Sequence, residues 1–226
     1  ILLEKLAIIG GSTNASGGAI MGVDSPLNAD DVDDTKDWAD FIYERDEKHE
    51  NVSYDKILYV ARVSGENIQW LMGYGYDPVL GYGGNSPVMW SHRPNDGTGN
   101  QLAHGGWKVI NALNDAFIAG GGRLMTETPA TELLLDENGA VVGVLAESAD
   151  TVYTIHAKGG VILACGGFDN NAEMIEAYAP ESAGLFNIGA NAGDDGDAIS
   201  LAEPAGAEII STGYLMPAWT TLHMCE

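Results

Sequence analysis

The 226-residue sequence has few cysteines and few basic side chains. Its two cysteines, Cys165 and Cys225, form neither a CxxC metal pattern nor a disulfide framework, so they leave the redox compartment open. Only 10 lysines and arginines stand against 33 aspartates and glutamates, which gives a formal net charge of −23. Nucleic acids and anionic membranes attract proteins mainly through cations that neutralise phosphates. We therefore expect neither of them as a partner.

The sequence also lacks a long apolar run and the short motifs of several large enzyme classes. It contains no stretch of the roughly 18 uninterrupted apolar residues that a transmembrane helix needs. There is no P-loop, no complete GxGxxG, no HExxH and no GxSxG, and the five histidines lie in unrelated contexts, which excludes a recognisable zinc site or Ser-His-Asp triad. The chain begins at Ile1 inside an apolar run, without an initiator Met or a basic signal region. We expect this to be a cut end, with any targeting segment outside the sequence.

The first half of the chain has helical periodicity. Residues 24–50 are crowded with acid, and Trp38, Phe41 and Ile42 recur at helical spacing, which predicts an amphipathic helix with a solvated acidic face. This stretch does not have the Asp-x-Asx-x-Asx-Gly order of a calcium loop, and no metal is expected. Two more helices are expected at 53–72 and 100–119. A long loop rich in Gly, Pro and aromatic residues is expected between them, at 73–99.

The spacing of apolar residues changes from helical to alternating after Arg123. Three short alternating stretches separated by turn sequences predict a three-stranded meander, with strands at 132–135, 141–146 and 152–155. The continuous apolar run 160–165 predicts a strand buried on both faces. Two short helices are expected at 173–179 and 197–205. This mixture of helices, a meander and a buried strand predicts an α/β fold.

Five short blocks follow one another along nearly the whole chain: Leu3-Glu4-Lys5, the run GGSTNASGG at 10–18, Ser91-His92-Arg93-Pro94, the run VILACGGF at 161–168, and Asp195-Gly196 followed by the Ala-rich stretch 202–207. Together they resemble the FAD-binding flavoproteins of the soluble fumarate reductase and succinate dehydrogenase-like group. The resemblance implies a partial Rossmann-like FAD-binding domain over 1–226, whose Gly-rich phosphate loop would lie about 20 residues before Glu4. Its implied parts are a helical and loop insertion (24–120), the β-meander (123–156), and a return to the FAD domain with the start of a substrate or cap region (160–226).

The resemblance assigns residues near the start of the chain to FAD. Glu4 matches the carboxylate that ends the second strand of a dinucleotide-binding fold and accepts the ribose hydroxyls, and Lys5 follows it. The alternative for Glu4 is an ordinary surface position at a strand end. The small residues that follow match a segment beside the pyrophosphate and the flavin, where the backbone can approach closely. These are Ser12, Thr13, Ser16, Gly17 and Gly18, and the alternative for them is an ordinary flexible loop.

Three later positions are also implied in FAD binding, and each has an alternative. The backbone at Ala130 would lie against the adenine, or Ala130 would simply open a strand. Gly166 would let the chain pass close under the cofactor, or would begin the next helix. Asp195 would lie beside FAD, or would cap the helix that follows.

The implied substrate region departs from the fumarate reductases. Residues 214–220 lack the histidine that the family places there in a His-Pro-Thr context, so fumarate is not expected as the preferred substrate. The substrate residues implied instead are His92, Trp219 and Thr220, with a buried loop anchor as the alternative for His92. The family's catalytic acid would lie beyond Glu226. Aromatic residues and a methionine of the long loop would line a substrate pocket or form loop core: Trp70, Tyr74, Tyr76, Tyr82, Met89 and Trp90.

The activity implied by the resemblance is FAD-dependent reduction of an activated C=C bond in a small organic molecule. A hydride would pass from flavin N5 to one alkene carbon, and a residue outside this chain would protonate the other. Electrons would come from a donor protein or from a haem or flavin domain. The alternatives are a flavin-dependent dehydrogenase of the ketosteroid type and a non-catalytic fragment, and this segment alone is not expected to turn over.

Overall fold

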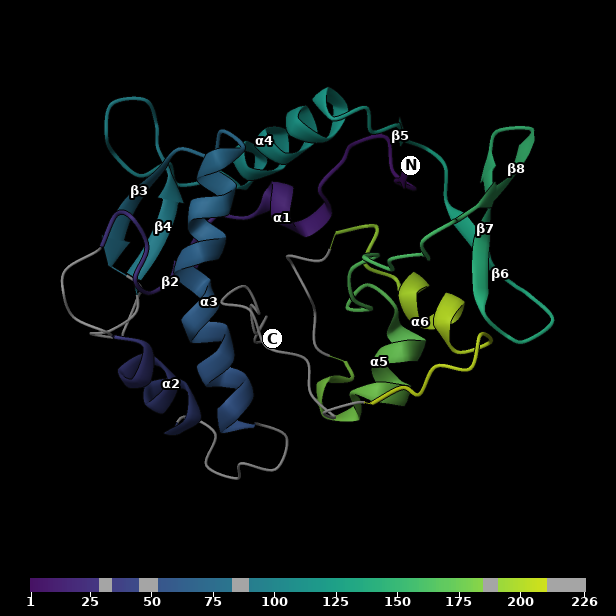
Figure 1. Cartoon of the computed structure of the whole chain (residues 1–226). Coiled ribbons are helices and arrows are strands. Elements are labelled where there is room, and N and C mark those ends of the chain that lie inside the picture. Colours follow the sequence, from purple (N-terminus) through teal and green to yellow (C-terminus); the bar gives the residue numbers. More distant parts are fainter. Residues whose placement is uncertain (29–33, 45–52, 83–89, 185–190, 211–226) are drawn as a thin grey trace, which may run out of the picture. The chain divides into compact units, whose positions relative to one another are not determined.

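The computed structural model describes residues 1–28, 34–44, 53–82, 90–184 and 191–210. The chain divides into two compact units (Figure 1). One unit combines Ile1–Ser12 with Gly122–Glu226, and the other is the continuous stretch Thr13–Gly121. Trp219, Thr220 and Met89 lie outside the described residues, as does the whole stretch 214–220.

Two helices form the apolar core of the continuous unit. Helix α2 (Thr35–Glu44) packs on helix α3 (Tyr54–Gly73). Val23, Trp38 and Ala61 are buried together, and Ile42 and Ile57 cover them. The amphipathic helix expected within 24–50 is therefore confirmed over Thr35–Glu44, whereas residues 24–28 form bends and a turn. The helix expected over 53–72 is confirmed.

The prediction of a loop over 73–99 is wrong in part, because this stretch contains two strands. Strands β2 (Ile20–Gly22), β3 (Pro78–Tyr82) and β4 (Trp90–Pro94) form an antiparallel sheet in the order β2-β4-β3. Pro78 and Pro94 stand at the outer ends of β3 and β4, where a missing N–H costs little. The side chains that β4 buries include the polar Ser91 and His92, so the strand has no alternation of apolar and polar residues that would predict it.

Helix α4 (Gly106–Ala119) begins later than the 100–119 expected from the sequence. The preceding residues form a turn held by two side chains: Gly97 N–H donates to Asn95 Oδ1 (2.9 Å) and Thr98 N–H donates to Asp96 Oδ1 (2.7 Å). Such local side-chain acceptors compete with helix formation. The short helix α1 (Gly11–Ala15) precedes β2 along the chain.

Two small sheets form the discontinuous unit. Strand β1 (Leu2–Leu3) pairs in parallel with β5 (Leu124–Met125). Strands β6 (Ala130–Leu135), β7 (Val141–Ser148) and β8 (Thr151–His156) form the antiparallel meander in the order β6-β7-β8 (Figure 1). The meander expected from the alternating pattern is confirmed. Its central strand buries Val144 and Ala146.

The expectation of a strand buried on both faces at 160–165 is wrong in this structure. Residues 161–167 carry no strand assignment, and Ile162 is 93 % exposed. Alternate residues are half-buried, yet no described strand pairs with the segment. Burial on both faces needs a neighbouring strand and covering helices, and the apolar composition of the segment itself cannot supply them.

Short helices complete the described part of this unit. Helix α5 (Ala172–Tyr178) is capped by Asn171, whose Oδ1 accepts from Met174 N–H (3.1 Å). The 3-10 turn η1 (Pro180–Ser182) and helix α6 (Asp197–Ala202) follow, so α6 is shorter than the 197–205 expected. None of the described helices is long and apolar enough to cross a bilayer.

Candidate functional site

Glu4 lies directly after β1, and hydrogen bonds of its own backbone fix its place. Its N–H donates to Met125 O (2.9 Å), and its carbonyl oxygen accepts from Thr128 N–H (3.0 Å). The carboxylate oxygen Oε1 accepts from Leu6 N–H (2.8 Å). Among the described residues, no hydrogen bond uses the second oxygen, Oε2. The end of a parallel strand therefore presents a half-buried carboxylate with acceptor capacity to spare.

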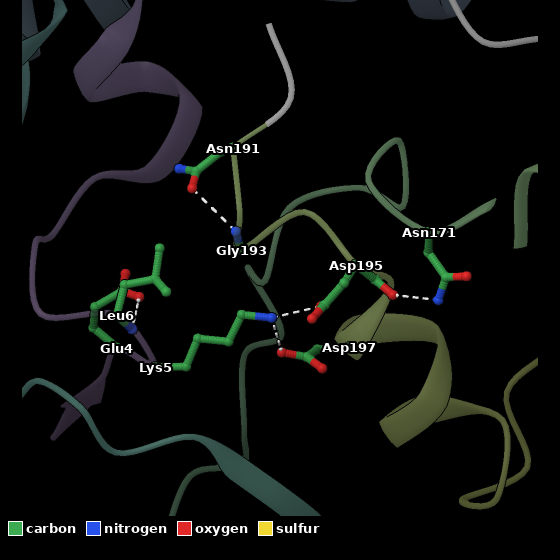
Figure 2. Close-up of polar contacts among 8 residues, drawn as sticks. All are labelled: Glu4, Lys5, Leu6, Asn171, Asn191, Gly193, Asp195 and Asp197. Atoms are coloured by element: carbon green, nitrogen blue, oxygen red, sulfur yellow. Dashed lines mark hydrogen bonds and ion pairs between the residues drawn. The ribbon is translucent and has the colours of Figure 1, made fainter. Parts of the chain in front are cut away.

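Lys5 binds two aspartates at the start of α6 (Figure 2). Its Nζ lies 2.5 Å from Asp195 Oδ1 and 2.7 Å from Asp197 Oδ2. Partial burial alone would lower the pKa of Lys5, but the hydrogen bonds and negative charges of the two aspartates outweigh it and raise the pKa above its ordinary value. This contact joins residues 190 and 192 positions apart in the chain.

The neighbouring Asp194 is buried and takes a separate partner. Its Oδ2 accepts from the Ser12 hydroxyl (2.5 Å). Gly166 has a φ of +81°, and a Cβ built there would lie 2.2 Å from Asp194 Oδ1, so the close approach requires glycine. The Ser12 hydroxyl has a single proton, which it gives to Asp194, and so it can meet a ligand only as an acceptor.

The helix-cap alternative for Asp195 does not match the observed contacts. Gly196 occupies the N-cap position of α6 with a φ of +92° and without a side-chain cap, while the Asp195 carboxylate bonds to Lys5. The Asp195 carbonyl accepts from Asn171 Nδ2 (2.9 Å), and Asn191 Oδ1 accepts from Gly193 N–H (3.0 Å; Figure 2). Among the described residues, no three His, Cys, Asp or Glu side chains are grouped so as to hold a metal ion. The partners of these aspartates are therefore Lys5, for Asp195 and Asp197, and Ser12, for Asp194.

In the continuous unit, the backbone of residues 16–18 is fixed against α4. Ser16 O accepts from Gly106 N–H (3.0 Å), and Gly17 O accepts from Gly105 N–H (3.3 Å). Gly18 has a φ of +71°, and a Cβ there would lie 2.8 Å from Gly106 N. Within the described part of the chain, the N–H groups of Gly17 and of the following Ala19 find no acceptor.

Further contacts of this segment involve Ser16 and Thr13. The Ser16 hydroxyl donates to Thr13 O (2.8 Å) and accepts from Gly18 N–H (3.1 Å). Thr13 itself is exposed. The carbonyls of residues 13, 16 and 17 are thus used internally, and N–H groups are left for a ligand with acceptor atoms.

His92 is fully buried, and both of its ring nitrogens have partners. Nδ1 lies 3.2 Å from Ile20 O, which can only accept, so Nδ1 carries a proton. Nε2 lies 2.7 Å from the buried Ser25 hydroxyl. Burial lowers the pKa of His92, and the bond to Ile20 offsets this in part. Its assignment to substrate stays a prediction, and its contacts are those of the buried anchor that the sequence left as the alternative.

Tyr76, which the sequence suggested as pocket lining or loop core, is a buried support for the same loop. It is 2 % exposed, and the single proton of its hydroxyl is shared between Gly18 O (3.3 Å) and His92 O (3.0 Å). Burial raises the pKa of Tyr76 to about 12. Ala130, in the other unit, opens β6 opposite Ala146, where Glu147 N–H donates to Pro129 O (3.0 Å).

The candidate residues therefore fall into two groups. Glu4, Lys5 and Asp195 come together in one unit, and Ser12 and Gly166 join them through Asp194. Thr13, Ser16, Gly17 and Gly18 form the second group, in the other unit. The sequence does not single out Asp194 and Asp197 as functional. The structure shows which side chain each of them contacts: Asp197 binds Lys5, and Asp194 accepts from Ser12.

These residues fit FAD. A nucleotide ribose offers two hydroxyl donors to a carboxylate such as that of Glu4 at a strand end. The pyrophosphate and the flavin carry acceptor atoms that suit the unpaired N–H groups of Gly17 and Ala19. A strand-end carboxylate beside a parallel strand pair, in one unit, and a closely packed glycine segment, in the other, are each features of α/β flavoproteins.

Comparison with known proteins agrees with this class. The FAD binding domain family matches residues 1–224, and the chain belongs to that family. The chain is 30 % identical over 223 residues to a urocanate reductase of Eggerthella lenta, a match that covers 95 % of the chain and 35 % of that protein. The expected cofactor, FAD, and the resemblance to FAD-binding flavoproteins are confirmed at the level of the family.

Solved structures resemble the chain over most of its length. A flavocytochrome c3 fumarate reductase in an open conformation matches with a TM-score of 0.77 and 25 % identity, over 92 % of this chain and 36 % of that one. A 3-ketosteroid-Δ4-(5α)-dehydrogenase from Rhodococcus jostii RHA1 matches with a TM-score of 0.77 and 26 % identity, over 91 % and 48 %. The expected α/β, Rossmann-like FAD-binding fold is confirmed. The chain spans 16 % to 42 % of the length of curated relatives that it matches.

Proposed function

We propose that this chain is the cofactor-binding part of an FAD-dependent oxidoreductase that reduces an activated C=C bond in a small organic substrate. The observation that carries the proposal is the Glu4 carboxylate at the end of β1, with Oε1 bound to Leu6 N–H and Oε2 unused among the described residues. In this role Glu4 accepts the ribose hydroxyls of FAD. Lys5, Asp195 and Ser12 shape the surroundings of that contact.

The described residues bind and orient the cofactor in this proposal. Bound FAD supplies the redox chemistry, as a hydride delivered from flavin N5 to one alkene carbon. The N–H groups of Gly17 and Ala19 supply hydrogen-bond donors along the cofactor, and the backbone at Ala130 lies against the adenine. The proposal assigns the proton for the second alkene carbon to none of the described residues.

Named activities of similar proteins support the reaction class. The names of the urocanate and fumarate reductases give their substrates, and both of these compounds contain a C=C bond conjugated to a carboxylate. The stretch 214–220 has no histidine, in contrast to the pattern expected of fumarate reductases. We therefore propose an enoate-like substrate other than fumarate, with Trp219 and Thr220 beside it, and an electron donor that is a protein or a fused haem or flavin domain.

The second candidate is a flavin-dependent dehydrogenase of the ketosteroid type. It is favoured by the likeness to the Rhodococcus dehydrogenase, whose TM-score equals that of the fumarate reductase. The two candidates differ in the direction of electron flow: a reductase receives electrons from a donor and passes them to the alkene, whereas a dehydrogenase removes them from a saturated ring.

The test uses the full-length natural protein. Its absorbance spectrum is recorded for bound flavin, and reduced viologen oxidation is measured with fumarate, urocanate, cinnamates and unsaturated steroids. A dye-reduction assay with saturated 3-ketosteroids covers the reverse direction. We expect flavin bands and turnover of a conjugated alkene other than fumarate. Fumarate with the highest kcat/KM would refute the substrate argument, and a protein without flavin would refute the function.

A further inference from the structure

We propose that Lys5 is a positioning residue that cancels charge: its ammonium holds Asp195 and Asp197 together and keeps their negative charge from repelling the diphosphate of FAD. The proposal rests on the proposed function, because it concerns the same cofactor site. It changes the role expected for Lys5 from the sequence, where it was grouped with the residues that bind FAD directly.

The geometry commits the ammonium group to the two carboxylates. Figure 2 shows the two contacts, in which Lys5 Nζ lies 2.5 Å from one carboxylate and 2.7 Å from the other. The Lys5 side chain is only 20 % exposed. An ammonium has three N–H donors, and two of them are used here. The pKa of Lys5 is raised, so the group stays charged at neutral pH.

The charge balance explains why such a contact is needed. Three of the four residues at 194–197 are aspartates, in a chain with 33 acids and 10 bases. Lys5 forms ion pairs with both Asp195 and Asp197. Without Lys5, Asp195 and Asp197 would carry two uncompensated negative charges next to a strand end that receives a dinucleotide. Like charges at close range repel, and salt weakens that repulsion.

The ion pairs of Lys5 are partly exposed to solvent, so we expect them to affect FAD binding more than the stability of the fold. The Asp195 and Asp197 side chains are 42 % and 35 % exposed. Ion pairs with that much solvent contribute little to folding. A loss of Lys5 should therefore appear in cofactor affinity and its salt dependence, while the unfolding midpoint changes little.

The experiment measures the FAD dissociation constant of the full-length apoprotein by flavin fluorescence at low and high NaCl. Lys5→Met removes the charge and Lys5→Arg keeps it. Lys36→Met is the matched control, because it removes one charge from an exposed lysine of α2 that pairs with Asp40. We expect Lys5→Met to raise the dissociation constant about tenfold or more at low salt and about threefold or less at 0.5 M NaCl, as screening removes the repulsion. Lys5→Arg and Lys36→Met should stay within about threefold of the wild type at both salts.

A second variant keeps the proposal testable if Lys5→Met does not fold. Asp197→Asn leaves Lys5 paired with Asp195 and removes one negative charge, so FAD should bind as tightly as in the wild type or more tightly at low salt. Weaker binding would overturn the proposal. So would a Lys5→Met defect of equal size at both salts, because an effect of charge must weaken as salt rises, or no defect at all. A wild-type protein without affinity for FAD would instead overturn the proposed function.

Discussion

The Tyr76 hydroxyl lies 3.3 Å from the carbonyl oxygen of Gly18, and the same hydroxyl is 3.0 Å from His92 O. One buried side chain therefore joins the glycine segment to β4. Because the Gly18 carbonyl points to Tyr76 and the Ser16 and Gly17 carbonyls accept from the start of α4, the segment has a fixed orientation before any ligand arrives. Pre-organisation of this kind lowers the cost of binding.

Removal of that hydroxyl should destabilise the protein. Tyr76→Phe leaves two buried carbonyl groups with one partner fewer, and we expect a loss of about 1–2 kcal/mol in the free energy of unfolding. Urea denaturation of the purified chain measures it. Tyr74→Phe is the control, since Tyr74 is 46 % exposed and its recorded contact is a ring contact with Trp70. Equal losses for the two variants would contradict the role given to Tyr76.

An alanine substitution should lower the stability of the protein more at Gly18 than at Gly121, although the two glycines have similar φ values. Gly18 and Gly121 have φ values of +71° and +83°, but a Cβ at Gly18 would lie 2.8 Å from Gly106 N, whereas nothing lies within 4 Å at Gly121. Both changes carry the strain of a positive φ, which costs about 1–2 kcal/mol. We expect Gly18→Ala to cost at least about 1 kcal/mol more because packed backbone must move. Thermal melts of both variants measure the difference, and similar midpoints would show that the approach to α4 is loose.

His92 should make stability depend on pH below neutrality. Its folded pKa is lowered from 6.5 by burial, so between that lowered pKa and 6.5 the unfolded chain binds more protons than the folded one. The contribution of His92 is therefore complete above pH 6.5 and is lost as the pH falls through its folded pKa. Urea unfolding at pH 7.5 and pH 5.5 should show a larger decrease for the wild type than for His92→Gln. The exposed His104 supplies the control, since His104→Gln should follow the wild type.

Glu4 should set the affinity for FAD. In the full-length protein, Glu4→Ala leaves the ribose hydroxyls without their acceptor, which costs about 1–3 kcal/mol and raises the FAD dissociation constant about fivefold to 150-fold. Flavin absorbance at limiting FAD measures occupancy. Glu137→Ala, at an exposed acid in the turn between β6 and β7, is the matched control. If Glu4→Ala and the wild type are equally occupied, Glu4 is a surface residue at a strand end.

The helices and the meander could be predicted from the sequence because local periodicity reports their burial. Trp38 and Ile42 repeat at the spacing of a helix, and the turn at Asp136 is marked by its own side chain, which accepts from Asn138 and Ala140 N–H. Strand β4 escaped prediction because its buried residues include Ser91 and His92, whose burial depends on partners such as Ser25 and Ile20.

The sequence could indicate which residues belong to the candidate site, but it could not show which of them contact one another. Glu4, Lys5 and Asp195 were singled out, yet nothing in a single sequence pairs Lys5 with acids 190 and 192 residues away. The Ser12–Asp194 bond and the Tyr76–Gly18 bond are of the same kind. Each depends on which chain segments the fold brings together, and composition or periodicity does not carry that information.

The exposed Ile162 also has a consequence for anyone who purifies this stretch alone. Residues 161–167 pair with none of the strands in the described part of the chain, and the apolar side chain of Ile162 among them is 93 % exposed. Such a segment is a template for intermolecular pairing and aggregation. The net charge of −23 opposes this near pH 7, but the charge vanishes near the sequence pI of about 4.2. Purification and storage well above that pH should keep the chain dispersed, and Ile162→Lys should widen the range of pH in which it stays in solution.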